Sequence, residues 1–288
     1  MVENLPRRPA VAGAFYAGTG KDLAQQIESC FLDPRGPGEL PARQRSARRA
    51  LDAAVVPHAG YMYSGPVAAH VYARIAAEKP PATVLILGVD HTGASRGASL
   101  SDRPWLTPLG PIEVDHDLVR ALTAGPVEVD EVAHAQEHSI EVQLPFLEYV
   151  LPKPRFVPLE VGFGPYAFLE EVAGIVREGV EGRDVLMLAS SDLSHYVPVA
   201  TADRLDHLAI DQILARDPRG LYDTVVRKRI SMCGIAPTTV LLAATQTRPL
   251  TSRLLRWGHS GEAEPMHEVV GYGAIALERE SGGGPAVS

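Results

Sequence analysis

The sequence predicts an α/β fold with a mostly parallel sheet, because short buried strands alternate with helices along the chain. Three apolar runs, residues 51–57, 83–88 and 184–190, have the length and β-branched content of strands that are covered on both faces. Residues 66–78 have apolar positions at helical spacing, and Pro66 suits the first turn of a helix.

The downstream segments continue this alternation. Four further helices are expected near residues 139–150, 165–178, 201–216 and 236–246. Three further strands, the last of them beside other core strands, are expected near residues 155–161, 251–257 and 268–277.

The length favours one domain over residues 1–280, since single α/β domains commonly reach about 200 to 250 residues. Residues 33–50 mix Pro, Gly and Arg, which is typical of an exposed loop, here between an N-terminal helix and the first core strand. Residues 281–288 are rich in glycine and are expected to form a flexible tail.

The composition argues against several classes of function. The formal net charge is −8 and no basic stripe follows the chain, so nucleic acid is not an expected partner. No run of 18 apolar residues is present, and residues 1–8 lack the apolar core of a signal peptide, which predicts a cytoplasmic protein without membrane contact. Cys30 and Cys233 are too few for a disulfide framework, so both are expected as reduced thiols.

Three histidines mark the predicted carboxyl ends of strands. His58, His91 and His195 each stand at or just beyond the end of a separate apolar run, where an open α/β sheet gathers its ligands. A lone histidine is more often a buried ring that bonds a backbone carbonyl, but three at equivalent strand ends favour a shared site. Asp192 lies three residues before His195, a spacing that brings two side chains together only if the turn is helical. Such a pair of side chains suits acid–base catalysis. The alternative is that Asp192 or Ser191 caps a helix.

Two more segments carry charged or reactive groups ahead of a predicted helix. Glu137 and His138 directly precede Ser139, a candidate N-cap, and this density of charge indicates the rim of a site. Cys233 stands just before the helix predicted at 236, where the helix dipole favours a thiolate that can bind metal. The alternative for Cys233 is a small buried hydrophobic side chain.

Taken together, these motifs resemble the Memo family, whose bacterial members are known as protein B of the AmmeMemoRadiSam system. The resemblance covers most of the chain and is carried by residues 8–16, 57–65, 86–91, 137–145, 190–195 and 233–234. It implies a three-layer α/β/α sandwich similar to class III extradiol dioxygenases, enzymes that use non-haem Fe(II) to open catechol rings.

The resemblance also implies the roles of individual residues. The metal-binding set would be His58, His91 and Cys233. The catalytic residues that line the same pocket would be His138, Asp192 and His195. Imidazole and thiolate suit Fe(II), the expected metal, with copper or zinc as alternatives, and three protein ligands leave positions open for a substrate.

The sequence departs from the pattern at two places. Cys233 stands where the ring-opening dioxygenases carry a carboxylate. This difference argues against the same ring-opening activity in this chain. Thr92 follows His91 where family members often have a second histidine, so proton transfer is expected to depend on His138 or His195.

Three functions remain open at this stage. The first is a dioxygenase-like oxidoreductase that acts on a small molecule, with Asp192 orienting the acid–base histidine. The second is a zinc-dependent hydrolase, because residues 134–138 fit the H-x-x-E-H pattern of inverted zinc peptidases. The third is a non-catalytic binder of metal or of phosphotyrosine peptides, as described for eukaryotic Memo relatives. The bacterial association also implies a functional link to a radical S-adenosylmethionine protein.

Two motifs of other enzymes are incomplete. The segment that ends at Gly20 and Lys21 has Phe15 where a phosphate loop needs glycine, so no ATP site is implied. Ser64 has Met62 where a nucleophile elbow needs glycine, which argues against a serine hydrolase.

Overall fold

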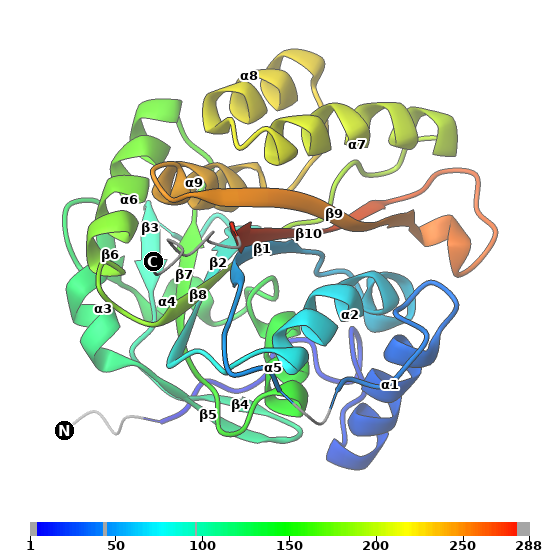
Figure 1. The fold of residues 1–288 in the computed structure, drawn as a ribbon, viewed down its shortest axis with the longest axis horizontal. Coiled ribbons are helices and arrows are strands. Elements are labelled where there is room, and N and C mark those ends of the chain that lie inside the picture. Colours follow the sequence, from blue (N-terminus) through cyan, green and yellow to red (C-terminus); the bar gives the residue numbers. More distant parts are fainter. Residues whose placement is uncertain (1–4, 43–44, 96, 281–288) are drawn as a thin grey trace, which may run out of the picture.

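The computed structural model describes residues 5–42, 45–95 and 97–280. Within these ranges, ten strands form one sheet with helices on both faces (Figure 1). The strands are β1 (Leu51–Val56), β2 (Thr83–Val89), β3 (Ala98–Leu100), β4 (Trp105–Thr107), β5 (Gly110–Val114), β6 (Val127–Val129), β7 (Arg155–Val161), β8 (Val185–Ser190), β9 (Leu250–His259) and β10 (Gly271–Arg279). The helices are α1 (Gly20–Leu32), α2 (Tyr61–Ala77), α3 (His116–Leu122), α4 (Glu131–His134), α5 (Leu144–Val150), α6 (Tyr166–Gly179), α7 (Val199–Leu214), α8 (Pro218–Lys228) and α9 (Ile235–Thr245), with the 3₁₀ turns η1 (Glu141–Gln143) and η2 (Ser260–Glu262).

The centre of the sheet is parallel, in the order β7-β2-β8-β1. All six residues of β1 and of β8 and all seven of β2 are buried, which explains why these strands are continuous apolar runs rather than alternating ones. β10 pairs with β1 in the antiparallel direction and β9 closes that edge. The predicted α/β class with a mostly parallel centre is confirmed, and the strand expected near 268–277 lies beside a core strand.

Helices form the two outer layers. In Figure 1, α2 lies with α1 and α5 on one side of the sheet, and α9 lies with α6, α7 and α8 on the other. All eleven residues of α9 are buried, because this helix is enclosed between the central strands and the helices α6 and α8. The expected three-layer α/β/α arrangement is therefore confirmed.

Helix α2 begins five residues earlier than the sequence predicts. It starts at Tyr61, which places Pro66 inside the helix rather than in its first turn. Proline has no N–H to donate to the carbonyl four residues earlier, that of Met62. The Arg35 guanidinium donates to the Met62 carbonyl instead (3.3 Å), so this carbonyl has a hydrogen-bond partner although Pro66 lies inside the helix.

The helix expected over 139–150 is also shorter than predicted. Ser139 is not its N-cap, because the Ser139 hydroxyl bonds the backbone N–H and carbonyl of Val89. A 3₁₀ turn follows, and α5 begins only at Leu144. Gly88 allows this close packing, since a Cβ there would lie 2.3 Å from Ile140.

The segment before the first core strand, the two cysteines and the lengths of the helices were also subjects of prediction. The described residues between 33 and 50 contain no helix or strand, and the tail predicted at 281–288 lies outside the described residues. Cys30 and Cys233 are both free thiols, as expected. Among the described helices, none has the length and apolar character needed to cross a bilayer.

Candidate metal centre

The candidate ligands follow adjacent parallel strands. His58 lies two residues beyond β1, His91 two beyond β2 and Asp192 two beyond β8. Because β8 pairs with both β1 and β2, their carboxyl ends share one edge of the sheet. Cys233 comes from the loop between α8 and α9 and reaches the same edge.

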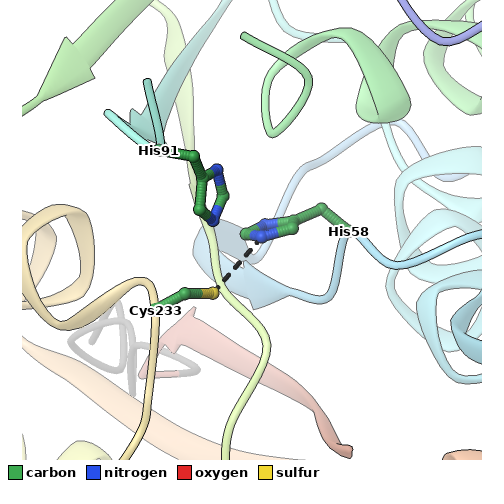
Figure 2. Close-up of side chains that lie close together, drawn as sticks. All are labelled: His58, His91 and Cys233. Carbon is green, nitrogen blue, oxygen red and sulfur yellow. Dashed lines mark hydrogen bonds between the residues drawn. The ribbon is translucent and has the colours of Figure 1, made fainter. Parts of the chain in front are cut away.

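The two histidines and the cysteine point toward one another in Figure 2. One ring nitrogen of His58, one of His91 and the sulfur of Cys233 all lie within 4.8 Å of one another. The sulfur is 3.3 Å from Nε2 of His58. The structure thus brings together the three residues that the resemblance implies as ligands.

Hydrogen bonds fix which nitrogen of His58 faces the site. Its Nδ1 lies 2.9 Å from the Ser190 hydroxyl. That hydroxyl gives its only proton to the Ser139 carbonyl (2.7 Å) and accepts from the Gln143 amide (2.8 Å). Nδ1 of His58 must therefore donate, which leaves the Nε2 lone pair free to bind a metal. Burial, together with the neighbouring His138 and His91, holds the pKa of His58 well below its usual range, so the ring is neutral.

A buried carboxylate orients His91. Glu137 accepts hydrogen bonds from Nδ1 of His91 (3.0 Å), from the His91 backbone N–H (2.8 Å) and from the N–H groups of His138 and Ser139 (both 2.8 Å). Burial raises the pKa of Glu137, but the hydrogen bond and charge of His91 and the Ser139 N–H outweigh it and lower the pKa to about 2. With Nδ1 of His91 engaged as a donor, its Nε2 is left for the metal.

Cys233 is a half-buried thiol beside the backbone of the segment that follows β8. The N–H of Asp192 points to the sulfur at 3.3 Å. Burial, aided by the nearby Asp192 carboxylate, raises the pKa of the Cys233 thiol well above its usual range. The helix dipole of α9 does not overcome this burial, so the thiol of the protein alone is protonated, and a bound cation would be needed to hold the thiolate.

The donor set fits a single transition metal. A metal about 2.1 Å from nitrogen and about 2.3 Å from sulfur separates its ligand atoms by about 3 to 4 Å. The separations here reach that range with little movement, and both imidazoles already have the correct nitrogen free. Iron, copper and zinc all accept two imidazoles and a thiolate.

Asp192 does not orient His195 as expected. Residues 191–195 are not helical, and Oδ1 of Asp192 accepts instead from the backbone N–H groups of His58 (2.8 Å) and Ala59 (3.3 Å). No helix begins at Ser191 or Asp192 either. Asp192 therefore holds the turn that carries His58, and burial raises its own pKa to about 6.

His195 is fixed by carbonyl groups. Its Nδ1 lies 2.9 Å from the Leu193 carbonyl and 2.8 Å from the Ser231 carbonyl. Carbonyls only accept, so Nδ1 carries the proton and Nε2 is the basic nitrogen. His138 stacks on His91 with ring centroids 4.7 Å apart, and burial lowers its pKa.

A cavity of about 650 Å³ opens onto this group. His58, His91, His138, Asp192 and His195 all line it. Further lining comes from the segment 13–17, from the start of α2 and from the region of β10. The volume is in the range of ordinary small-molecule sites.

Glu141 holds one wall of this cavity. It accepts from the Arg7 guanidinium (2.8 Å), from the N–H groups of Ala10 (2.7 Å) and Val11 (3.0 Å), and from the Tyr16 hydroxyl (2.6 Å). These bonds fasten the N-terminal segment beside the metal centre. The sequence indicated Glu137 as part of a site rim, but it did not show that Glu137 and Glu141 are both buried and each anchors another segment.

His134 is not part of the site. It is fully buried, its Nε2 bonds the Ser99 carbonyl (2.9 Å), and its other nitrogen faces Glu160. Helix α4 ends at His134, so His134 and His138 do not share a helix face. The zinc-peptidase reading of residues 134–138 requires that shared face and is not supported.

An α/β sandwich with two oriented imidazoles and a thiol at the carboxyl edge of its parallel strands defines a candidate mononuclear metalloprotein. A family model described as Memo-like protein matches residues 7–276, and the chain belongs to this family. It is 40% identical over 283 residues to a MEMO1 family protein of Methanopyrus kandleri, an alignment that covers 96% of this chain and 100% of that protein. It is 42% identical over 278 residues to a MEMO1 family protein of Sulfurisphaera tokodaii, with 92% and 97% covered.

The fold is also found among solved structures. An uncharacterized protein of Escherichia coli K12, JW3007, matches with a TM-score of 0.56 at 14% identity, over 78% of this chain and 99% of that chain. At this identity the likeness shows a shared fold.

Proposed function

We propose that this Memo-family protein is a metal-dependent, dioxygenase-like oxidoreductase in which His58, His91 and Cys233 hold one Fe(II) ion. The substrate would be a small, electron-rich molecule such as an aromatic diol. The observation that carries the proposal is the convergence of two Nε2 lone pairs and one sulfur, with the opposite nitrogen of each ring engaged as a donor.

The chemistry of the proposed reaction balances without an outside reductant. Bound Fe(II) would supply a centre where the diol and O₂ meet. Both atoms of O₂ enter the product, one ring C–C bond breaks, and all the electrons that O₂ accepts come from the substrate. The proton that leaves the diol returns to the product.

The protein's own groups provide the proton transfer and the binding. His195 presents a basic Nε2 to the cavity and would take the diol proton. Glu137 and Ser190 keep His91 and His58 in their ligating tautomers. Phe15 packs edge-on against His138, with ring centroids 4.8 Å apart, and would help to exclude water beside the reacting ring.

O₂ uptake tests this function directly. The protein is loaded with iron without oxygen, mixed with simple catechols and then exposed to O₂, while oxygen consumption and ring-opened product are followed together. We expect one O₂ consumed per product, and a His195→Gln variant that keeps its iron but loses most of kcat. If no catechol drives O₂ uptake in the iron-loaded protein, the oxidoreductase proposal fails and a non-catalytic metal binder is favoured.

A further inference from the structure

A second cavity, the amino-end hollow, lies at the opposite edge of the sheet from the metal centre. It is lined by residues 47–49 before β1, Lys79 between α2 and β2, residues 182–184 before β8, and Arg279 at the end of β10. β10 runs antiparallel to β1, so its last residues lie beside the first residues of β1. The six residues of β1 separate the two sites by about 20 Å.

The amino-end hollow has a surplus of positive charge. Its described lining contains one carboxylate, that of Asp184. The same lining contains five cationic side chains, those of Arg48, Arg49, Lys79, Arg183 and Arg279. The formal net charge of the whole chain is −8, so this gathering of cations reverses the average charge of the molecule. Clustered arginine and lysine side chains attract anions.

The carboxylate in the lining is already paired. Asp184 lies 2.6 Å from the Arg49 guanidinium and 3.8 Å from the Lys79 ammonium. The Arg49 side chain is 6% exposed and also donates to the Leu51 and Val185 carbonyls (3.1 and 3.4 Å). Its Nη1 is buried without an acceptor among the described residues. Asp184 is therefore held by a buried cation in the wall, and it leaves the other arginines of the lining uncompensated.

Arg279 shares its anionic partner with another arginine. The fully buried carboxylate of Asp52 accepts from Nε and Nη2 of Arg279 (2.9 and 2.6 Å). The same carboxylate accepts from the Arg248 guanidinium (2.5 Å). One negative charge thus faces two positive charges, so Arg279 is fixed in place but is only partly neutralised.

Arg48 and Arg183 have no anionic partner of their own. Both residues are exposed, and neither side chain forms an ion pair or a hydrogen bond within the described part of the chain. Like charges that share one hollow repel each other, and a bound anion would relieve this repulsion. The planar guanidinium presents paired N–H donors that match the oxygens of a phosphate group.

We propose that the amino-end hollow binds a small polyanion that carries two or more phosphate groups. Its volume of about 600 Å³ exceeds what a single phosphate fills, and several negative charges are needed to balance the surplus of cations. Among the described residues, no aromatic side chain lines the hollow, so the phosphate groups rather than an attached base are recognised. The cations gather in one hollow instead of forming a stripe, which disfavours nucleic acid. This site goes beyond the proposed function and does not depend on it.

Calorimetric titration of the full-length protein tests the site without turnover. The probes are sodium sulfate, pyrophosphate and tripolyphosphate, with ATP as the fourth, all in buffer without magnesium. We expect one tripolyphosphate per chain, bound at least about tenfold more tightly than sulfate, with pyrophosphate between them. ATP should bind about as tightly as tripolyphosphate. Higher salt should weaken each of these affinities, because the lining is open to solvent.

Variants then locate the binding. The double variant Arg48→Gln, Arg183→Gln should lose at least about tenfold in affinity for tripolyphosphate. The matched control is Arg120→Gln, Arg219→Gln, which makes the same change in net charge at exposed arginines outside the hollow. His58→Ala should also bind tripolyphosphate as the wild type does, because polyphosphate held by a metal would need the intact centre. Circular dichroism confirms that each variant is folded.

The outcomes separate this inference from the proposed function. No saturable binding of tripolyphosphate, equal affinities in the two double variants, or loss of binding in His58→Ala overturns the inference. Tighter binding of a single-stranded oligonucleotide than of tripolyphosphate would assign the surface to nucleic acid and overturn it as well. Binding that is lost only in Arg48→Gln, Arg183→Gln supports the site, whether or not catechols drive O₂ uptake.

Discussion

Replacing Glu137 with glutamine tests the claim that a buried carboxylate sets the geometry of the metal centre. Glu137 accepts four hydrogen bonds, at 2.8 to 3.0 Å, from two nitrogens of His91 and the backbone of His138 and Ser139. A glutamine oxygen at the Oε1 position can keep three of them. Its amide group would then face the backbone N–H of His91, donor against donor.

The expected cost follows from these contacts. One lost hydrogen bond to a charged acceptor costs about 1.5–3 kcal/mol, and the other three become weaker when the acceptor is neutral. We therefore expect Glu137→Gln to lower the free energy of unfolding by about 3 kcal/mol. Metal affinity should fall by about 10- to 100-fold, because Nδ1 of His91 loses its charged partner.

Urea unfolding measures the free energy of unfolding, and chelator competition measures the metal affinity. Glu148→Gln is the control, since Glu148 is half-buried and, among the described residues, bonds only the Thr107 hydroxyl, and burial raises its pKa to about 7. The control should change neither quantity much. A Glu137→Gln protein with unchanged metal affinity would refute the role assigned to Glu137.

Three further substitutions give independent predictions. Cys233→Ala should weaken metal binding at least tenfold in chelator competition while the fold stays intact, and Cys30→Ala, which alters the other free thiol, should not; equal affinities would remove Cys233 from the site. Glu141→Gln should lower the free energy of unfolding in urea by about 3 kcal/mol, because it breaks a buried pair with Arg7; a change under about 1 kcal/mol would contradict this. Burial raises the pKa of Glu160 to about 10, so the folded chain keeps a proton that the unfolded chain loses above about pH 4.5. Glu160 should therefore contribute a loss of stability as pH rises from 5.5 to 8.5, and Glu160→Gln should remove that contribution from the slope; identical slopes in urea titrations would refute it.

The sequence predicts those parts of the fold that follow from local pattern. The helices α6 and α9 lie within one residue of the expected ranges. The apolar spacing of α6 reflects its one buried face, whereas α9 is a continuous apolar run because all of its residues are buried. The strands β1, β2 and β8 are apparent as apolar runs for the same reason. The strand ends then bring His58 and His91 to one edge, which is why two ligands could be anticipated from position.

Features set by distant contacts could not be predicted in this way. The start of α2 depends on Arg35, which lies outside the helix and bonds the Met62 carbonyl that Pro66 leaves without a donor. Ser139 looks like a cap in the sequence, but its hydroxyl is taken by Val89 of the neighbouring strand β2. Short strands such as β3 and β6, with three residues each, carry too little pattern to be recognised.

The same limit applies within the site. The spacing of Asp192 and His195 suggested a direct pair, but each side chain bonds a different segment of backbone. The partner of His195, Ser231, lies 36 residues away in the sequence, and no local signal links them. Cys233 joined the predicted ligands through the family resemblance rather than through periodicity.

Metal content per chain after anaerobic purification is the most direct test of the central claim. The wild-type protein is analysed beside His58→Ala and beside His207→Ala, a control on α7 whose exposed ring bonds the Asp203 carbonyl. We predict close to one equivalent of iron in the wild type and in His207→Ala, and loss of that iron in His58→Ala. Equal iron in His58→Ala, or no metal bound by the wild type even after reconstitution, would contradict the account.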